Sequence, residues 1–532
     1  MFNIYAIITY KNRVFKVKAE NLEEALNSYI EQTLGFDVNF NMKREPWIKI
    51  NQLVKPIDTK ISFLNELCKI PANRISQIIL ESTSHPFEGY GTTYELSDDV
   101  TYAVVTGCDK TQDVIVIAET YDGLPVTTIG AQAFLNSNLS SIIIPDSITT
   151  LREQVFYNCA KLKTVEIPDS ITSIGYSAFS GCTSLANLTI PDSVNELGQY
   201  ALYNCNQLNS ITLSNNITNI GMKTFFGCTS LVYITIPSSV THISTEAFSG
   251  CNSLPSIIIP KSVTSIDAAA LKGCRSLESI TLPFVGASAN GTSNTHFGYI
   301  FGATEAKNNN SFMAFIRKVV ITPPCTRIHT QAFYGCTSIE NITIPSSVTN
   351  IEWEAFKGCT GLRSITLPFI GAAQDGTSDT HFGYIFGANS YSETSTHVPD
   401  VLTNVEITAP CRKIDSSAFR NCANIESIII PKSVKSIGKY AFQGCTALQK
   451  IEIPSSISTI PNDLFKGCTS LQEVTLPTSI TTIESGAFDS CSNLKKINYY
   501  GTAAQWKSKI SIQSDNRYLN TVEINYNYVP LT

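Results

Sequence analysis

The stretch Ile167–Leu185, IPDSITSIGYSAFSGCTSL, decides the fold because its pattern returns at one fixed period along most of the chain. The proline that follows its first isoleucine recurs in steps of 23 or 46 residues, apart from two longer steps, at Pro145, Pro168, Pro191, Pro237, Pro260, Pro283, Pro345, Pro368, Pro431, Pro454 and Pro477. Cysteine keeps the same period. A fixed period within roughly 20–50 residues predicts a stack of similar units rather than several globular domains.

Each repeat has the pattern of one coil of a solenoid. Its segment L-x-x-I-x-I alternates as a strand with one buried face does, and the proline after it has no N–H for a strand ladder. An Ala-Phe turn follows, and the ring recurs at Phe156, Phe179, Phe225, Phe248, Phe333, Phe356, Phe419, Phe442, Phe465 and Phe488, with leucine at positions 202 and 271. One coil cannot bury these side chains alone, so stability must come from stacking.

The pattern resembles the BspA-like leucine-rich repeat family, whose hallmark is IPxSVTxIGxxAFxGCxSL. The hallmark stands here at Ile190–Val194, and again at Ile430–Val434 with Ala441–Cys445. The resemblance covers roughly residues 95–500. It implies a curved parallel-sheet solenoid used for binding, often at bacterial or protist surfaces, and it implies no reaction.

The sequence therefore predicts an α/β-type repeat solenoid of the leucine-rich repeat kind, with a right-handed coil and one long parallel β-sheet, joined to a small α+β domain. We expect the α+β domain over residues 1–90, the solenoid over 91–500 and a C-terminal cap over 501–532. Two insertions, at about 284–316 and 369–402, interrupt the solenoid.

The non-repeating ends carry local signals. In the first domain, alternation predicts a hairpin of Phe2–Tyr10 and Arg13–Ala19, and periodicity predicts helices over residues 22–34 and 61–69. At the start of the solenoid, residues 101–106 and 114–117 are expected to pair. In the cap, we expect a helical turn at 503–508 that places Trp506 over the final coil, and a last strand at 519–524.

Composition excludes several classes of function. The net charge is −6, so the chain lacks the basic surface that nucleic-acid binding needs. No apolar run reaches the length of a membrane span. Lysine and arginine interrupt the N-terminal apolar residues, which argues against a signal peptide. We expect a cytoplasmic protein as the sequence is given, and a cell-surface or secreted one if an export segment precedes it.

The sixteen cysteines fit a reducing compartment, in which thiols serve as small buried apolar groups. Stacked coils are about 4.8 Å apart, within the roughly 4.4–6.8 Å between Cα atoms that a disulfide tolerates. Disulfide bridges and metal binding therefore stay open as alternatives. Cys325 and Cys411 replace a core valine and are expected to be buried.

The two insertions begin with nearly the same text, PFVGASANGTSNTHFGYIFGA at 283–303 and PFIGAAQDGTSDTHFGYIFGA at 368–388. We expect them to leave one face as paired aromatic-rich loops. The hypothesis is that a protein partner contacts Phe297, Tyr299, Phe301, Phe382, Tyr384 and Phe386. The competing interpretation is that these rings fold inward. On the sheet face, where small hydroxyls dominate the outward positions, Tyr233 is the remaining candidate.

No nucleophile, base and orienting group share a usable spacing, so we predict no enzyme, no cofactor and no metal site. His296 and His381 are equivalent, but single ligands several coils apart do not complete a metal site. We predict a non-catalytic protein-binding or scaffold protein. The alternatives are a surface adhesin that binds host or neighbouring-cell proteins, a structural spacer, and an enzyme or effector whose activity lies in residues 1–90.

Overall fold

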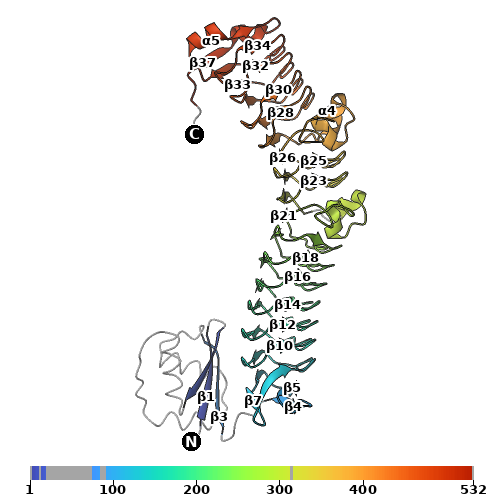
Figure 1. Cartoon of the computed structure of the whole chain (residues 1–532), viewed down its shortest axis with the longest axis vertical. Coiled ribbons are helices and arrows are strands. Elements are labelled where there is room, and N and C mark those ends of the chain that lie inside the picture. Colours follow the sequence, from blue (N-terminus) through green and yellow to red (C-terminus); the bar gives the residue numbers. More distant parts are fainter. Residues whose placement is uncertain (1–2, 11–12, 20–74, 84–90, 312–314, 530–532) are drawn as a thin grey trace, which may run out of the picture. The chain divides into compact units, whose positions relative to one another are not determined.

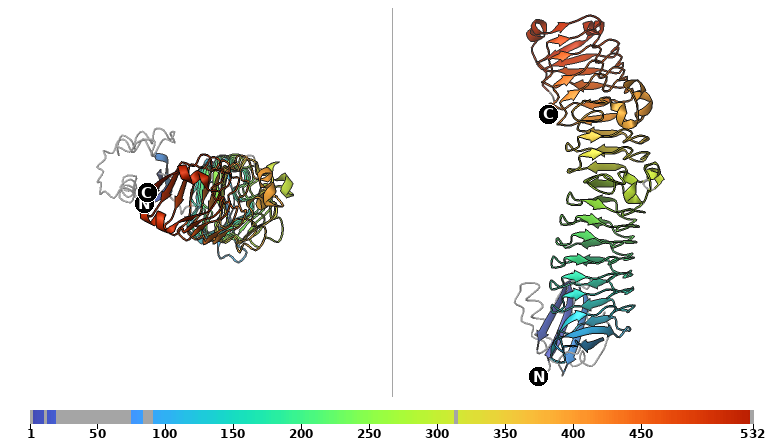
Figure 2. Two further views of the ribbon diagram at one scale, coloured as in Figure 1. Left: turned by 90° about the horizontal axis from the view of Figure 1, so that it is seen from above. Right: turned by 45° about the vertical axis from the view of Figure 1, so that its right-hand side comes forward.

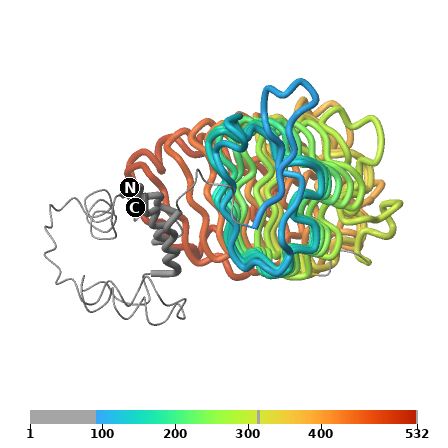
Figure 3. The backbone as a smooth tube through the Cα atoms, turned by 90° about the horizontal axis from the view of Figure 1, so that it is seen from below, coloured from blue at the N-terminus to red at the C-terminus, as the bar shows by residue number. Residues whose placement is uncertain are grey.

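The computed structural model describes residues 3–10, 13–19, 75–83, 91–311 and 315–529. The chain forms two compact units, Met1–Ser214 and Asn215–Thr532, each of which is described by itself. Within each unit the coils lie one behind another with closely similar outlines (Figure 3). The repeat solenoid predicted from the sequence is confirmed.

The N-terminal residues form a three-stranded antiparallel sheet in the order β2-β1-β3 (Figure 1). The predicted hairpin is confirmed, with β1 at Asn3–Tyr10 and β2 at Arg13–Ala19. The third strand, β3 at Ile75–Thr83, pairs with β1 and was not predicted. The two helices expected over 22–34 and 61–69 lie outside the described residues.

The first coil of the solenoid differs from the prediction. β4 (Thr92–Leu96) pairs antiparallel with β5 (Ala103–Cys108), and β5 runs parallel to β8 (Leu124–Ile129). The expected pairing of residues 101–106 with 114–117 is therefore wrong. β6 (Val114–Val116) instead begins another parallel ladder, and its residues Ile115 and Val116 are buried. The short strand β7 (Thr120–Tyr121) folds back on β8.

Each regular coil contributes strands to two parallel ladders, and only the first ladder was predicted. In the N-terminal unit, the first ladder consists of two groups, β6 with β9 (Ser141–Ile143) and β11 (Thr164–Val165), and then β13 (Asn187–Thr189) with β15 (Ser210–Thr212). The second ladder contains β8, β10 (Thr150–Leu151), β12 (Ser173–Ile174) and β14 (Glu196–Leu197). The second ladder arises because the isoleucine of the T-x-I segment points inward, as Ile174 does with no exposed surface.

In the C-terminal unit, one parallel sheet of eleven strands carries the first ladder (Figure 1). Its strands, in order, are β19 (Ser256–Ile258), β21 (Ser279–Leu282), β22 (Lys318–Ile321), β24 (Asn341–Thr343), β26 (Ser364–Leu367), β27 (Asn404–Ile407), β29 (Ser427–Ile429), β31 (Lys450–Glu452), β33 (Glu473–Leu476), β35 (Lys496–Tyr499) and β37 (Glu523–Tyr526). β17 (Tyr233–Ile234) belongs to the coil before β19. The register advances by one coil at each step, so equivalent residues stack.

Short strands form the second ladder of this unit in separate groups. They are β16 (Asn219–Ile220), β18 (His242–Ile243) and β20 (Ser265–Ile266); β23 (Arg327–Ile328) and β25 (Asn350–Ile351); β28 (Lys413–Ile414) and β30 (Ser436–Ile437); and β32 (Thr459–Ile460), β34 (Thr482–Ile483) and β36 (Ser511–Ile512). Two of the three breaks between these groups fall where the insertions enter, and the third lies between β30 and β32. The insertions therefore interrupt the second ladder while the first ladder stays continuous.

A column of phenylalanine rings runs through the core. Successive rings stack face to face, with centroids 5.1 Å apart for Phe156 and Phe179 and 5.5 Å apart for Phe442 and Phe465. These rings are completely buried. The predicted ring column is confirmed, and its stacked geometry is one that favours aromatic pairs.

A column of cysteines lies beside the rings. All described cysteines are unbridged, and every one except the half-buried Cys108 is buried, including Cys325 and Cys411 as predicted. Many thiols donate a hydrogen bond to a phenylalanine carbonyl 26 residues earlier, as Cys445 does to Phe419 at 3.2 Å. A thiol that donates its proton in this way holds one coil to the previous one, which a disulfide sulfur could not do.

We expect stability to fall as the pH rises above about 8.5, where an unfolded cysteine begins to ionise. Burial raises the pKa of Cys274, Cys359, Cys445 and Cys491 to about 12. Between these two values the unfolded chain loses thiol protons that the folded chain keeps, so ionisation favours unfolding. Urea denaturation at steps from pH 7 to pH 10.5 measures this slope. The variant Cys445→Ala should show a shallower slope, and an equal slope in both proteins would contradict the prediction.

The C-terminal residues pack on the last coil. α5 (Ala503–Lys509) begins at Thr502, whose hydroxyl accepts from the Gln505 N–H at 3.2 Å, and it confirms the expected helical turn. Trp506 is buried against the edge of Tyr499, with ring centroids 5.2 Å apart, as the lid prediction requires. The last strand begins later than predicted, because η6 (Arg517–Thr521) is a 3₁₀ helix and β37 starts at Glu523.

Candidate interaction surfaces

The two insertions project from the same side of the C-terminal unit, as expected (Figures 1 and 2). The first contains the 3₁₀ helices η2 (Phe297–Phe301) and η3 (Ala306–Ser311). The second contains η4 (Phe382–Phe386) and η5 (Tyr391–Glu393), followed by α4 (Thr394–His397).

The shared segment HFGYIF takes the place of an Ala-Phe turn in the stack of coils. In the first insertion, the Leu271 N–H donates to Ile300 O at 2.8 Å and the Phe297 N–H donates to Ala332 O at 2.7 Å. In the second insertion, Phe382 makes the equivalent bond to Ala418. The segment therefore joins the coil before it to the coil after it through backbone hydrogen bonds.

Burial overturns part of the predicted partner site. Phe297, Phe301, Phe382 and Phe386 are buried, so their rings are not available to a partner in the folded chain. Phe297 packs 5.1 Å from Phe333, and the equivalent Phe382 packs 5.0 Å from Phe419. The four rings continue the phenylalanine column across each insertion. The inward interpretation is the correct one for these residues.

The three tyrosines of the predicted site are more accessible. Tyr299 and Tyr384 are partly exposed, and burial raises the pKa of both hydroxyls. In Tyr299, a hydrogen bond between the hydroxyl and the backbone of Ala268 partly opposes this rise in pKa. The same bond ties the ring to the preceding coil. Tyr233, on the sheet face, is 65% exposed, and its hydroxyl lies 2.8 Å from the Thr235 hydroxyl. Contact of these tyrosines with a partner stays a prediction.

A buried asparagine holds the first insertion closed. Asn309 Oδ1 lies 2.9 Å from His296 Nδ1 and accepts from the Gly298 N–H at 2.9 Å, while its Nδ2 donates to Tyr334 O at 3.0 Å. Asn309 has no exposed surface. Glycine is required at 298 because a Cβ there would overlap the Asn309 side chain.

The second insertion lacks this arrangement. Thr394 stands where the first insertion has Asn309, at the same spacing from the shared segment. Among the described residues, its buried hydroxyl and His381 Nδ1 have no hydrogen-bond partner. Burial lowers the pKa of both His296 and His381, so the neutral imidazole is favoured in each insertion.

An arginine between two tyrosines marks the surface beside the second insertion. We call Tyr391, Arg420 and Tyr440 the Arg420 cluster. The guanidinium carbon of Arg420 lies 4.8 Å from the Tyr391 ring centroid and 5.7 Å from that of Tyr440. Tyr391 remains 42% exposed. No pattern in the sequence points to this cluster, because its members come from three different coils.

A serine, a histidine and an aspartate meet on the second ladder. His242 Nδ1 lies 2.6 Å from Ser265 Oγ, and His242 Nε2 lies 3.3 Å from Asp267 Oδ2. Spacing in the sequence does not reveal this group, because His242 and Ser265 come from neighbouring strands. In the second copy of this duplicated region, Arg327 and Glu352 stand at the positions equivalent to His242 and Asp267. Arg327 Nη1 lies 3.2 Å from Glu352 Oε1. The shared feature of the two positions is a contact between a basic and an acidic side chain of neighbouring coils.

Two negative findings apply to the part of the chain that is described. No group of three or more His, Cys, Asp or Glu side chains there is arranged to hold a metal ion. No helix in the same residues has the length and apolar character needed to cross a membrane.

The stacked ladders, the ring column and the repeat text agree with a known family. The BspA type leucine rich repeat region matches the chain in six copies, over residues 127–254, 198–293, 307–373 and 397–515. The chain belongs to this family. A search of curated proteins found no match.

Solved structures of leucine-rich repeat proteins are similar to this BspA-type chain. A leucine rich cell surface protein from Faecalibacterium prausnitzii is 27% identical, with 80% of this chain and 99% of that chain covered and a TM-score of 0.35. A leucine-rich repeat protein from Bacteroides ovatus is 22% identical, with coverages of 82% and 98% and a TM-score of 0.35. One from T. pallidum is 28% identical, with coverages of 31% and 88% and a TM-score of 0.28.

Proposed function

We propose that this BspA-type protein is a non-catalytic scaffold that binds a protein partner through the surface beside its second insertion. The Arg420 cluster supports the proposal, because arginine and tyrosine are enriched among the residues that dominate protein–protein binding energies. The ring contacts also hold the arginine in place before a partner arrives. A side chain ordered in advance loses less conformational entropy on binding.

The first insertion provides an internal comparison. At the positions equivalent to Tyr391, Arg420 and Tyr440 it carries Ala306, Tyr334 and Glu354. The arginine between two rings therefore belongs to one insertion, although the buried parts of the two insertions are nearly identical. A feature that the fold does not need in both copies is a better candidate for recognition than one that it repeats.

The Ser265–His242–Asp267 group does not support an enzyme. A nucleophilic serine needs a histidine base that a carboxylate orients, together with donors for the developing oxyanion. The residue equivalent to His242 is Arg327, which cannot act as a base and forms an ion pair with Glu352. Joining adjacent strands explains both positions.

The proposal is tested by capture of partners on the immobilised intact chain, followed by measurement of the affinity of each captured protein. The double variant Tyr391→Ser, Arg420→Ala is expected to weaken binding by about tenfold or more, as loss of a hot spot does. Tyr334→Ala, at the equivalent position of the first insertion, serves as the matched control and should bind normally.

Four results would contradict this assignment. Unchanged affinity in the double variant would remove the Arg420 cluster from the contact, and loss of binding in Tyr233→Ser would move the contact to the sheet face. Turnover of a substrate that is lost in Ser265→Ala would show an enzyme. A shift in thermal unfolding of the double variant would mean that the cluster serves the fold.

A further inference from the structure

Among the described residues, the sheet of the C-terminal unit has an unpaired outer edge at β37. β37 is the last strand of the eleven-stranded sheet, and β36 is the last strand of its second-ladder group. Within residues 91–311 and 315–529, no strand pairs with the outer edge of either. A sheet edge carries backbone N–H and C=O groups that can pair with another extended chain.

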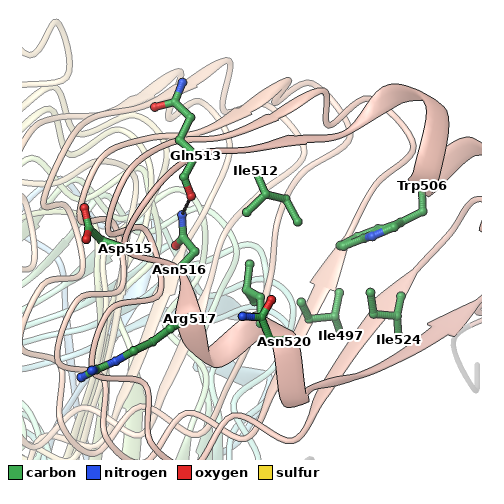
Figure 4. A pocket seen from close by; sticks show the side chains of 10 residues that line it. Ile497, Trp506, Ile512, Gln513, Asp515, Asn516, Arg517, Asn520 and Ile524 are labelled. Atoms are coloured by element: carbon green, nitrogen blue, oxygen red, sulfur yellow. Dashed lines mark hydrogen bonds between the residues drawn. The ribbon is translucent and has the colours of Figure 1, made fainter.

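A cavity with a mixed lining lies directly inside this edge, and the polar part of its wall consists of Gln513, Asp515, Asn516, Arg517 and Asn520. It has a volume of about 460 Å³, and its apolar wall consists of Ile497, Trp506, Ile512, Leu519 and Ile524. Figure 4 shows Trp506, Ile512, Ile497 and Ile524 around one open space. Ile512 is 45% exposed there, unlike the buried isoleucines at equivalent positions of earlier coils. The cavity volume falls within the roughly 300–1,000 Å³ of ligand-binding pockets.

The stacking of earlier coils shows what fits against this edge. Ile524 lies beside Ile497 in the parallel register, and Ile497 lies beside Val474 in the same way. A further strand that followed β37 in register would place an apolar side chain beside Ile524, above the cavity. The polar residue after it would stand beside Asn525, on the opposite face.

The charges along the outer face of the sheet indicate which residue should precede this apolar side chain in the added strand. On the outer face, the equivalent positions of four successive strands are Lys450, Glu473, Lys496 and Glu523, so the sign alternates. Lys450 Nζ lies 3.1 Å from Glu473 Oε2, which shows that neighbours in this column do pair. Glu523 is exposed at the end of the column, and a basic residue would continue the alternation.

We propose that this end binds an extended peptide of the pattern basic–apolar–polar–apolar, which adds as a parallel strand to β37. Backbone hydrogen bonds to the β37 edge hold the peptide, as in other cases of strand addition. Its basic residue pairs with Glu523 and its first apolar side chain covers the cavity beside Ile512 and Leu519. This site is separate from the Arg420 cluster and does not depend on the function proposed above.

The experiment measures binding of a fluorescent peptide to the intact chain by anisotropy. The probe is ALQKIEIPSS, the sequence of residues 447–456, which has the required pattern in its KIEI segment. A second peptide carries glutamate in place of its lysine, and a third carries serine in place of both isoleucines. We expect the first peptide to bind and the third not to bind.

Two protein variants make the test specific. Glu523→Lys should weaken binding of the first peptide by about threefold to tenfold and strengthen binding of the glutamate peptide, because the sign of the end position is reversed. Ile512→Asp should abolish binding, and circular dichroism checks that a change at this exposed position leaves the fold intact. Glu406→Lys, an equally exposed reversal within the same sheet face, is the matched control and should bind normally.

The outcomes separate the candidate occupants of the edge. The proposal would be overturned if the first peptide does not bind. It would also be overturned if Glu523→Lys and Ile512→Asp leave the affinity for that peptide unchanged. Sedimentation that shows a dimer of the chain, dissociated by Glu523→Lys, would assign the edge to a second copy and also overturn it. Reversed peptide preference in Glu523→Lys would support it.

Discussion

Replacing Phe297 with alanine is expected to lower the free energy of unfolding by about 3–5 kcal/mol. The ring has no exposed surface and lies between Phe301, 5.3 Å away, and Phe333, 5.1 Å away. Its removal leaves a cavity in a column whose neighbours are fixed by backbone hydrogen bonds on both sides. Phe382→Ala should have a similar effect in the second insertion, because Phe382 contacts Phe386 and Phe419 in the same way.

The measurement must be local, because a repeat protein does not need to unfold in one step. Amide hydrogen exchange reports the opening free energy of each coil. In Phe297→Ala, faster exchange should be confined to the coils that flank the first insertion. Tyr233→Ala, which truncates an exposed ring, is the control and should change stability by less than about 0.5 kcal/mol. Normal exchange in Phe297→Ala combined with loss of partner binding would assign this residue to the partner site instead of the core.

Most of the fold follows from the repeat alone. The alternation of L-x-x-I-x-I predicts the first ladder, and the fixed period predicts that equivalent residues stack. The second ladder could not be predicted in the same way, because its strands are two residues long in most coils, as Ser173–Ile174 shows. Two residues are too few to show a period, and only stacking makes them a sheet.

The error at the insertions has an identifiable cause. The prediction treated each insertion as a complete coil with an added loop. In that interpretation, the core does not need the aromatic residues of the loop. The coil between Leu282 and Ile321 contains no Ala-Phe-x-Gly-Cys segment, and neither does the coil between Leu367 and Ile407. Each coil must nevertheless fill the ring position between its neighbours. The absence of the Ala-Phe-x-Gly-Cys segment from these two coils therefore indicates that HFGYIF supplies the buried ring in its place.

Groups of side chains that come together from different coils are harder to predict from the sequence. The Arg420 cluster and the Ser265–His242–Asp267 group each join side chains from different coils. Spacing in the sequence predicts which coil a residue belongs to, but side-chain length and direction decide which neighbours it reaches. Such contacts follow only from the three-dimensional arrangement.

Asn309→Ala is expected to cost at least about 2 kcal/mol, because removing one partner of a buried hydrogen bond costs about 1–3 kcal/mol for each group left unsatisfied. Three groups would lose their partner: His296 Nδ1, the Gly298 N–H and the Tyr334 carbonyl. The exchange rates of residues 296–303 should rise, since the amide of Asn309 is what ties this segment to the rest of the insertion. Asn308→Ala, at the partly exposed neighbouring position, is the control and should have little effect.

The second insertion allows the reverse experiment. Thr394→Asn places an asparagine at the position equivalent to Asn309, where His381 Nδ1 has no partner among the described residues. If the new amide reaches both His381 and the Gly383 N–H, stability should rise by about 1 kcal/mol, the net value of a typical hydrogen bond. Asn309→Thr should move the first insertion in the opposite direction. A gain in Thr394→Asn together with a loss in Asn309→Thr would show that one buried amide sets the stability of either loop. Equal stability of all four proteins, including Asn309→Ala, would show that the backbone bonds of the HFGYIF segment are sufficient without it.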